Sequence, residues 1–452
     1  MSRMGKVLNK LSSTLWIQVV VSCLIALVFG RFVAMATPYN NMLYSPQQGY
    51  EYSGIIYGTL FFLAMLMLIG QRRFDALTLI AAALCIVYAL YARTTLLGFQ
   101  AVDYTTFLKP WNESLRALTL KEALSTQIGD YNLLYVYFLA IVSRFCDESL
   151  LAIKAASTLF DVVLAYLAMK LVALESKDCR LQIAAFLVVL VSPVIIFNSA
   201  QWGQCDSTYV AFCLLAVYAA LQGRGRLCAI SWTIAFCFKL QSVFMLPALA
   251  VAFFMGRVKA KHLLWIPAVY ILTTLPAVFC GRSFLSCFRI YSTQMSEYSG
   301  LQMNAPSVWC LLGGEYDTPY GSTAVFIGIA SLVIFTLLCL TLYKRIDTAQ
   351  LLKLFFISAL IVPYLLPRMH ERYFYMAEIL SVVYFLCNTR KWYVPIVLNL
   401  AALSTYSQYL LKKAPFLSLT SSSIAIMLIL AYEVRGLFGE LWRITPDRIE
   451  VD

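Results

Sequence analysis

The chain has 452 residues, of which 61% are hydrophobic and only 13% are charged, and its mean hydropathy is +0.76. Charged residues are about half as frequent as in an ordinary globular domain, which excludes a soluble fold. The formal net charge is +12, but the basic residues cluster in short loops between apolar runs, which indicates membrane topology and argues against nucleic-acid binding. The composition predicts an all-α polytopic membrane protein.

Apolar runs long enough to cross a hydrocarbon core of about 30 Å recur from end to end. The first follows Arg3, Lys6 and Lys10 and resembles a signal peptide, but its length and Arg31 favour an uncleaved span. We predict about 14 transmembrane helices (13–14). They lie near residues 15–36, 54–70, 74–92, 150–172, 181–198, 206–222, 226–239, 243–256, 261–280, 322–343, 350–366, 373–388, 392–410 and 416–433.

Two of these runs, on either side of Lys239-Leu240-Gln241, are shorter than the others. They fit either two short spans or one broken hairpin that stops inside a cavity. Irregular backbone at that depth needs a lining of protein or water. Both interpretations put Lys239 at the break.

The basic loops assign the sides of the membrane, because Lys and Arg are retained on the cytosolic side. The loop 37–54 has no Lys or Arg and is expected to be exoplasmic. If the short run 133–145 crossed the membrane, every later basic loop would lie outside. We therefore expect this run to be an interfacial or re-entrant helix within a long exoplasmic loop, residues 93–149. Both chain ends are then cytosolic, whereas Lys412 and Lys413 fall outside. The loops expected to be cytosolic contain Gln71-Arg72-Arg73, Lys177 to Arg180, Arg224 with Arg226, Arg257 to Lys261, Lys344-Arg345 and Arg390-Lys391.

The 13 cysteines show no Cys-x-x-Cys pair and no zinc-like spacing, so we expect reduced thiols that pack as small hydrophobic groups. Cys280, Cys287 and Cys310 share one expected exoplasmic region, which leaves a disulfide open. Asp161 lies near the middle of a span, and we expect it to pair with Lys154 on the same helical face.

With this topology, five exoplasmic segments collect the unusual polar residues, which favours a shared polar cavity. Each segment also has a simpler interpretation. Asp206 could cap a helix, and Arg368 and Arg372 could extend to lipid headgroups. The segments are Asp103-Tyr104 with Trp111 to Arg116 and Asp130 to Asn132, Asn198 to Ser207, Lys239 with Gln241, Gln302 to Pro306, and Pro367 to Tyr373.

The residue types in these segments suit transfer of a sugar from a lipid phosphate. Asp103 is not part of an Asp-x-Asp pair, so no metal is specified, and a single carboxylate suits a general base. Lys239, Arg368, His370 and Arg372 could hold a phosphate and stabilise its charge as it leaves. Because phosphate is a good leaving group, no second carboxylic acid is needed, in contrast to glycosidases.

Five motifs carry a family resemblance through their order and spacing. They are Asp103-Tyr104 with Phe107 and Trp111, Gly129-Asp130-Tyr131-Asn132, Gln201-Trp202-Gly203-Gln204 with Asp206, Phe238-Lys239 with Gln241, and His370-Glu371-Arg372. Over roughly residues 75–390 the chain resembles the C-type superfamily of membrane glycosyltransferases, which use polyprenyl- or dolichyl-phosphate sugars. It is most similar to bacterial proteins described as similar to the second mannosyltransferase of GPI-anchor synthesis. A more distant similarity is to the dolichyl-phosphate-glucose glucosyltransferases.

The resemblance implies that Asp103 is the catalytic base and that His370 helps to hold the donor phosphate, with Arg372 where Lys is common. The chain differs from the glucosyltransferases in two respects. Asn132-Leu133-Leu134 stand where those enzymes usually have two prolines, and two additional spans precede the span that leads into the catalytic loop. The remaining residues expected to bind sugar or acceptor are Asp130, Tyr131, Gln201, Gln204, Asp206, Gln241 and Glu371.

The resemblance implies three parts: an N-terminal transmembrane hairpin at 1–73, a glycosyltransferase module at 74–280, and a C-terminal transmembrane module at 281–452. The expected donor is a polyprenyl-phosphate hexose, mannose or glucose, with no metal or other cofactor. The acceptor could be a glycan, a cell-wall polymer or a protein. The expected location is a bacterial plasma membrane, or the endoplasmic reticulum membrane in a eukaryote, with an exoplasmic active site.

Two other functions remain open. A transporter or flippase of lipid-linked sugars would need polar groups through the middle of the membrane, and such proteins often have an internal repeat. The sequence shows no repeat, and its polar residues gather on one side. A non-catalytic scaffold subunit predicts that Asp103→Asn leaves cellular glycans unchanged.

Overall fold

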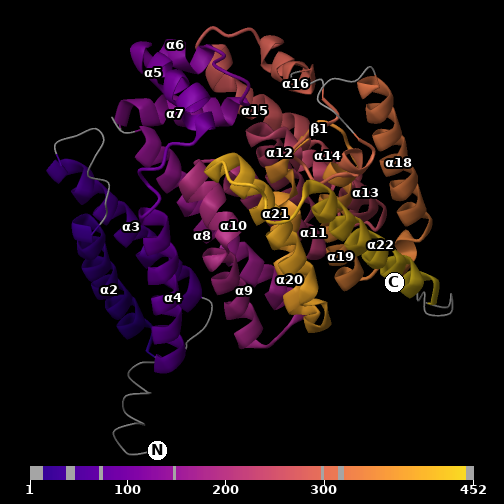
Figure 1. Cartoon of the computed structure of the whole chain (residues 1–452), viewed down its shortest axis with the longest axis horizontal. Helices are drawn as coiled ribbons and strands as arrows, with labels where there is room; N and C mark the ends of the chain where they lie inside the picture. The colour runs from indigo at the N-terminus through magenta and orange to yellow at the C-terminus, as the bar shows by residue number, and fades with distance from the viewer. Residues whose placement is uncertain are drawn as a thin grey trace, which may run out of the picture. The chain divides into compact units, whose positions relative to one another are not determined.

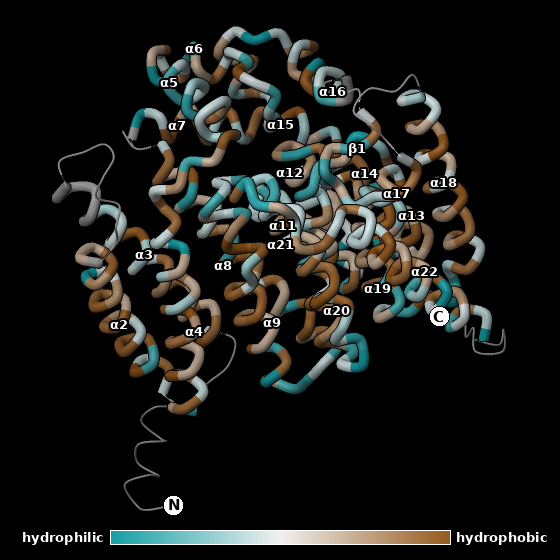
Figure 2. The backbone as a smooth tube through the Cα atoms, viewed as in Figure 1, coloured by the Kyte–Doolittle hydropathy of each residue, from teal (hydrophilic) through white to brown (hydrophobic). Residues whose placement is uncertain are grey.

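The computed structural model describes residues 14–36, 46–70, 75–145, 149–296, 300–313 and 320–443 (Figure 1). Within these ranges eight helices are long and apolar enough to cross a membrane, or nine if one bent pair counts as a span. Figure 2 shows how hydrophobic residues dominate such helices, for example α2 (Leu15–Ala36) and α18 (Gly321–Thr341). The chain is an all-α, multi-pass membrane protein. The predicted number of about 14 spans is not confirmed.

The described residues belong to two compact units. Unit 1 takes its residues from 1–110, 146–173 and 178–208, and unit 2 from 111–145, 174–177 and 209–452. The N-terminal basic residues, the first half of the predicted loop 37–54 and the basic residues at 71–73 lie outside the described residues. In the second half of this segment the predicted loop is wrong, because helix α3 already begins at Pro46, whereas its exoplasmic side stays a prediction.

Unit 1 is built on two long helices, α4 and α8, with a helical hairpin before them and a bent helix after them. Its elements are α2, α3 (Pro46–Ile69), α4 (Ala76–Thr94), η2 (Tyr104–Leu108), α8 (Ser149–Glu175), α9 (Cys179–Val191), α10 (Pro193–Ile196), η3 (Phe197–Trp202) and the first turn of α11 (Asp206–Leu221). The predicted single span 181–198 is instead a helix pair bent by 42°. Pro193 lacks an amide hydrogen and therefore interrupts the helix at this point.

Helices α2 and α3 pack with their backbones in close contact. A Cβ atom on Gly54 would lie 2.4 Å from the carbonyl oxygen of Gly30, and one on Gly30 would lie 2.6 Å from the carbonyl oxygen of Gly54. Small residues allow this approach between membrane helices, where dispersion contacts replace the hydrophobic effect.

Unit 2 contains most of the shorter helices. Its elements are α5 (Lys109–Ala117), α6 (Leu120–Ser125), α7 (Leu133–Phe145), α11, α12 (Gly225–Phe238), η4 (Leu240–Met245), α13 (Leu246–Phe254), α14 (Ala260–Leu263), α15 (Trp265–Phe279), α16 (Ser286–Ser296), β1 (Gln302–Met303), α17 (Val308–Leu311), α18, η5 (Tyr343–Arg345), α19 (Thr348–Leu365), β2 (Met369–His370), η6 (Glu371–Phe374), α20 (Tyr375–Cys387), η7 (Thr389–Lys391), α21 (Tyr393–Leu411) and α22 (Leu419–Arg443).

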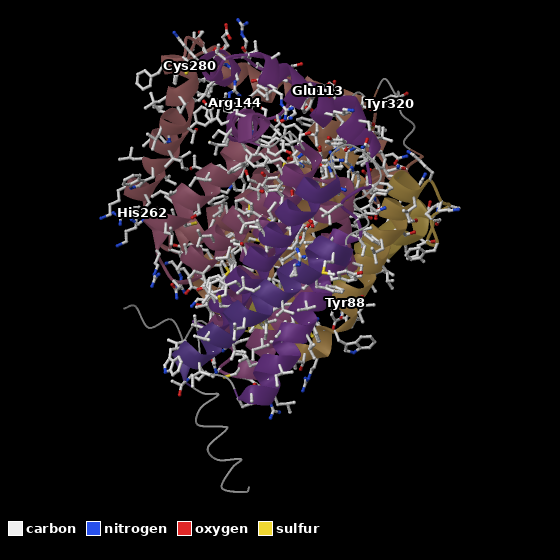
Figure 3. All side chains as sticks on the ribbon, turned by 90° about the vertical axis from the view of Figure 1, so that its left-hand side faces the viewer. Tyr88, Glu113, Arg144, His262, Cys280 and Tyr320 are labelled. Carbon is white, nitrogen blue, oxygen red and sulfur yellow. The ribbon has the colours of Figure 1, made fainter. Side chains whose placement is uncertain are left out.

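The run 133–145 forms a helix of 13 residues, α7, whose bounds match the prediction. Arg116 of α5 donates to the carbonyl oxygen of Ser143 at 3.0 Å, and Arg144 donates to that of Leu118 at 2.8 Å. These bonds hold α5 against the C-terminal end of α7. Figure 3 shows Glu113, Arg144 and Cys280 at one end of unit 2, with His262 set apart from them.

The backbone breaks at Lys239, which is extended (φ −155°, ψ 135°) between α12 and η4. The 14 residues of α12 are too few to cross a membrane alone. At the far end, a Cβ atom on Gly225 would lie 2.8 Å from the carbonyl oxygen of Arg257, and Arg257 donates to the carbonyl oxygen of Leu221 at 3.1 Å. Helices α12 and α13 therefore form a hairpin that turns at Lys239, a shape that both predicted alternatives share.

All twelve cysteines in the described part of the chain are free thiols. Cys280, Cys287 and Cys310 are among them, so the structure contains no disulfide between these three residues. The division into three parts stays a prediction.

Candidate functional site

The predicted site residues belong to both units, and each group is described within its own unit. Asp103, Gln201, Gln204 and Asp206 are in unit 1. The unit 2 group consists of Asp130, Tyr131, Lys239, Gln241, Arg368, His370, Glu371 and Arg372.

The Asp103 carboxylate lies at the start of η2 and is partly exposed. Its Oδ2 atom accepts a hydrogen bond from Trp202 Nε1 at 3.0 Å and another from Gln204 Nε2 at 2.8 Å. Both donors are neutral, and their side chains are almost completely buried. The carboxylate is therefore held in one orientation by two buried side chains, at a residue that is itself partly exposed.

The loop that carries both donors has an unusual backbone. Trp202 is the last residue of the π-helix η3, and the chain leaves this helix through Gly203, whose φ of +75° suits glycine. The amide of the next residue, Gln204, donates to the carbonyl oxygen of Asn198 at 3.0 Å. The Asn198 side chain donates to Asp206 Oδ2 at 2.9 Å. Asp206 begins helix α11, and Gln201 is buried in η3.

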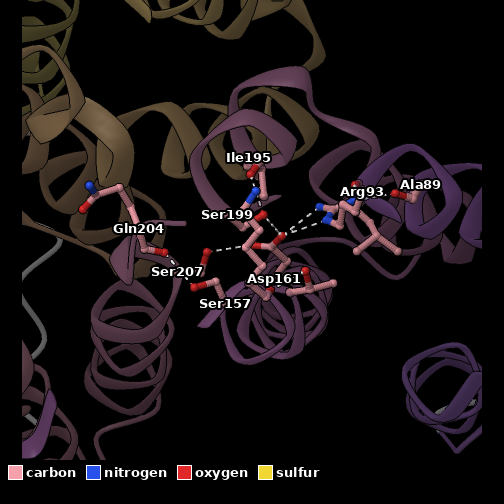
Figure 4. Close-up of polar contacts among 11 residues, drawn as sticks. Ala89, Arg93, Ser157, Asp161, Ile195, Ser199, Gln204 and Ser207 are labelled. Carbon is pink, nitrogen blue, oxygen red and sulfur yellow. Dashed lines mark hydrogen bonds and ion pairs between the residues drawn. The ribbon is translucent and has the colours of Figure 1, made fainter. Parts of the chain in front are cut away.

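A buried ion pair lies behind this loop (Figure 4). Arg93 Nη2 and Asp161 Oδ2 are 2.9 Å apart, and neither side chain is exposed. The Asp161 carboxylate also accepts hydrogen bonds from the hydroxyl groups of Ser199 and Ser207. Burial of two charges is costly, and hydrogen bonds that satisfy the remaining lone pairs offset that cost.

The prediction that Asp161 pairs with Lys154 is wrong. Lys154 instead donates to the carbonyl oxygens of Leu96, Leu97 and Phe99, at 2.7, 3.2 and 2.6 Å. Residues seven apart on a helix share a face but lie about 10 Å apart along the axis, whereas adjacent pairs are three or four apart. Arg93 was missed, although a charged residue inside a span usually pairs with an opposite charge on a neighbouring helix.

In unit 2, the segment around His370 is held by a short parallel strand pairing. β1 and β2 pair with Gln302 opposite Met369 and Met303 opposite His370. Arg368, which precedes β2, has a positive φ of 64° and donates its amide to the carbonyl oxygen of Leu301 at 3.0 Å. A left-handed conformation is uncommon for arginine and occurs most often where a site holds the backbone in place.

His370 shares its surroundings with two cations. Burial and the positive charges of Arg372 and Lys239 lower the pKa of its imidazole to about 3. His370 is therefore neutral near pH 7 and can contribute a hydrogen bond, but no positive charge, to a phosphate site. Arg372 also lies 3.8 Å from Glu371. Lys239 is buried beside the ring of Tyr209, with its Nζ atom 5.8 Å from the ring centroid.

The structure brings the loop at 129–132 against the end of α12. The side chain of Asn132 donates to the carbonyl oxygen of Phe236 at 2.9 Å, three residues before Lys239. A Cβ atom on Gly129 would lie 2.3 Å from the indole ring of Trp111, so no larger residue fits there. Trp111 also contacts Tyr131 edge to face, with ring centroids 5.7 Å apart.

The other two predicted residues lie on the same elements. Gln241 is in η4, two residues after the break. Glu371 lines a small cavity together with Glu378, Pro306 and Leu360, and both carboxylates are 3% exposed.

Asp103 and Gln204 are thus in direct contact, and His370, Arg372 and Lys239 form a second group. In the described residues no three His, Cys, Asp or Glu side chains converge as metal ligands. No protein-family model matches the chain, and no curated protein matches it at a significant level.

Proposed function

We propose that the chain is an inverting glycosyltransferase that moves a hexose, mannose or glucose, from a polyprenyl-phosphate sugar to an acceptor hydroxyl. The observation that carries this proposal is the partly exposed Asp103 carboxylate, held by the buried side chains of Trp202 and Gln204. A general base must be fixed in position within reach of the proton that it removes, and the two hydrogen bonds supply the fixed position.

In the proposed reaction the acceptor hydroxyl loses its proton to Asp103. The hydroxyl oxygen attacks the anomeric carbon, and the bond from that carbon to the phosphate oxygen breaks. The electron pair of that bond leaves with the polyprenyl phosphate. A single displacement inverts the configuration at the anomeric carbon.

The unit 2 group supports a phosphate-binding role. Lys239 and Arg372 supply positive charge next to the neutral His370 imidazole, which can donate one hydrogen bond. Cations fixed before the reaction stabilise the negative charge that develops on the leaving phosphate. Arg368 is proposed to join them, and Asp130, Tyr131, Gln241 and Glu371 to contact sugar or acceptor.

We further propose that the active site is exoplasmic and that the fourteen predicted segments are all embedded. The segments beyond the nine candidate spans correspond to α11, α12, α13, α20 and α22. The α12–α13 hairpin enters and leaves on one side, so its re-entrant form keeps both chain ends cytosolic. The basic residues Arg224, Arg226 and Arg257 lie at the base of this hairpin, which supports a cytosolic base.

The test uses the full chain, purified in nanodiscs, with a panel of polyprenyl-phosphate hexoses and candidate acceptors. Released polyprenyl phosphate and the anomeric configuration of the product are measured. We expect release with at least one donor and an inverted product. Asp103→Asn should lower the rate about a hundredfold to ten-thousandfold, because general-base catalysis contributes that much.

The matched control is Asp178→Asn, which also removes a carboxylate from unit 1. Asp178 is exposed and caps α9 by accepting from the amide of Arg180 at 2.8 Å, and asparagine caps a helix equally well. Its rate should equal that of the wild type. An Asp103→Asn variant that turns over at the wild-type rate would refute the proposal.

Transport of a lipid-linked sugar is the second candidate, and the Arg93–Asp161 pair favours it. Charged pairs inside membrane helices often mark a transport pathway. This function predicts no polyprenyl phosphate release with any donor or acceptor, but movement of the lipid-linked sugar between leaflets of vesicles that contain the protein.

A further inference from the structure

Helix α8 presents three buried polar side chains on one face, all directed at the segments that form the Asp103 site. Lys154, Ser157 and Asp161 follow one another at spacings of three and four residues, which places them on one stripe of the helix. Lys154 and Asp161 are fully buried, and Ser157 is 3% exposed. Such residues are expensive inside a membrane helix and usually serve a function.

Lys154 fixes the segment that leads to Asp103. Its ammonium group donates to three carbonyl oxygens in the turn after α4, the last of them that of Phe99. Carbonyl groups at and after a helix end have no partner within the helix, so a cation satisfies them and stabilises the turn. Asp103 follows four residues later.

Ser157 and Asp161 fix the loop that supplies the hydrogen-bond donors. Ser157 Oγ donates to the carbonyl oxygen of Gln204 at 2.7 Å. Asp161 accepts from Ser199 Oγ at 2.6 Å before the donors and from the Ser207 hydroxyl after them. The loop that contains Trp202 and Gln204 is thus held at three points (Figure 4).

Arg93 keeps the Asp161 carboxylate in place for these contacts. Its Nε atom donates to Asp161 Oδ2 at 2.9 Å, and its Nη1 atom donates to the carbonyl oxygen of Ala89 at 2.8 Å and to that of Leu190 at 3.0 Å. The guanidinium is therefore tied to α4 and α9, and the carboxylate reaches the loop from a fixed position. Arg93 Nε and Nη2 both approach the same oxygen, Asp161 Oδ2, which leaves Oδ1 to accept from the Ser207 hydroxyl.

We propose that Asp161, with Ser199 and Ser207, is a positioning residue that sets the orientation of the Asp103 carboxylate through Trp202 and Gln204. The inference deepens the proposed function and rests on it for its kinetic consequence. The contact chain itself does not depend on the reaction, so it can be tested separately. An error of about 1 Å in the position of a reacting group can lower a rate by about a hundredfold.

The first measurement monitors the surroundings of the Trp202 indole by ¹⁹F NMR and does not require enzyme activity. The eight tryptophans are replaced by 5-fluorotryptophan in the full chain, and the ¹⁹F resonance of Trp202 is assigned with Trp202→Phe. The test variant is Ser199→Ala/Ser207→Ala, which removes both hydroxyl links and leaves the Arg93–Asp161 pair intact. Should the double variant fail to fold, each single variant is used. We expect the Trp202 resonance to shift or broaden.

The matched control is Thr158→Val, which removes a buried hydroxyl from helix α8, the helix that carries Asp161. The Thr158 hydroxyl donates at 2.8 Å to the carbonyl oxygen of Lys154, within the helix, and does not reach the loop. The Trp202 resonance should stay unchanged in this variant. An unchanged resonance in the Ser199→Ala/Ser207→Ala variant as well would overturn the inference.

The second measurement is kinetic, on the donor that the wild type uses best. The serine variants should lower kcat by about tenfold to a hundredfold with little change in KM for the donor, because the donor phosphate is bound elsewhere. In the Asp103→Asn background the same substitutions should cause almost no further loss. An equal loss in both backgrounds means a merely structural role and overturns the inference.

The two proposals fail in distinguishable ways. If the wild type does not turn over but the Trp202 resonance moves in the serine variants, the proposed function fails and the positioning contact holds. If the wild type turns over, with an unmoved resonance and losses that are equal in both backgrounds, the proposed function holds and the positioning role fails.

Discussion

Two aspartates show how differently one residue type can be used in this protein. Asp103 is partly exposed and accepts from two neutral donors, whereas Asp161 is fully buried and pairs with Arg93. The sequence analysis gave them different roles, a general base and one half of an ion pair, but it did not find the partners that separate their two environments. That separation depends on burial and on partners more than 60 positions away in the chain.

The fold lowers the pKa of the His370 imidazole. Its folded-state pKa of about 3 is below the ordinary value of 6.5, so the unfolded chain binds a proton at this group more readily than the folded chain. The stability due to the neutral imidazole is complete above pH 6.5 and is lost as the pH falls from 6.5 towards 3. One such group changes the free energy of unfolding by at most about 1.4 kcal/mol per pH unit.

We therefore predict that His370→Gln weakens the acid dependence of stability. Between pH 7.5 and 5, roughly the range of one histidine titration, the melting temperature of the detergent-solubilised wild type should fall more than that of the variant. His262→Gln is the control, because it removes the other histidine and leaves His370 in place. Equal melting curves for His370→Gln and wild type across this range would contradict the prediction.

At the scale of elements, length and hydropathy predicted some helices well and missed others. The helix at Leu133–Phe145 has its predicted bounds, because a run of apolar residues between polar turns is a local signal. The bend at Pro193 and the start of α3 at Pro46 were missed. The break at Lys239 was predicted, because both alternatives for this region, two short spans or one broken hairpin, place it there.

The α2–α3 pair gives the prediction at this scale. Gly54→Ala should lower the free energy of unfolding by about 1–3 kcal/mol, because overpacking at a close helix contact forces backbone shifts. The new Cβ atom would lie 2.4 Å from the carbonyl oxygen of Gly30 and 2.8 Å from the Cβ atom of Ala34. Thermal unfolding in detergent measures the effect.

Gly439→Ala is the matched control for this prediction. Gly439 is also within a helix, α22, but a Cβ atom there meets no other atom within 4 Å. Alanine should be neutral or slightly stabilising at this position because of its higher helix propensity. A Gly54→Ala variant as stable as Gly439→Ala would rule out the close contact of α2 and α3.

At the scale of the whole molecule, the distribution of basic residues predicts which loops face the cytosol. Lys261 and Glu113 are both exposed in unit 2 and are expected on opposite sides of the membrane. Glu113 is expected on the exoplasmic side, because it lies in the predicted loop 93–149. That loop includes the run 133–145, since a crossing there would place the later basic loops outside the cell.

We predict that a membrane-impermeant maleimide labels Glu113→Cys in intact cells and labels Lys261→Cys only after permeabilisation. The wild type provides the background from its own cysteines, including Cys280. Labelling of Lys261→Cys in intact cells would reverse the topology and would place the basic loops outside.

The sequence by itself determined that this is a helical multi-pass membrane protein and which residues are candidates for chemistry. Hydropathy, charge and residue type are properties of short segments, so they can be read locally. The tertiary structure alone decided the partners: Trp202 and Gln204 for Asp103, Arg93 for Asp161, and carbonyl groups for Lys154. It also decided that the pKa of His370 lies well below its ordinary value, through burial and the nearby cations Arg372 and Lys239. These features depend on burial and on contacts between distant segments, and they arise only when the helices pack.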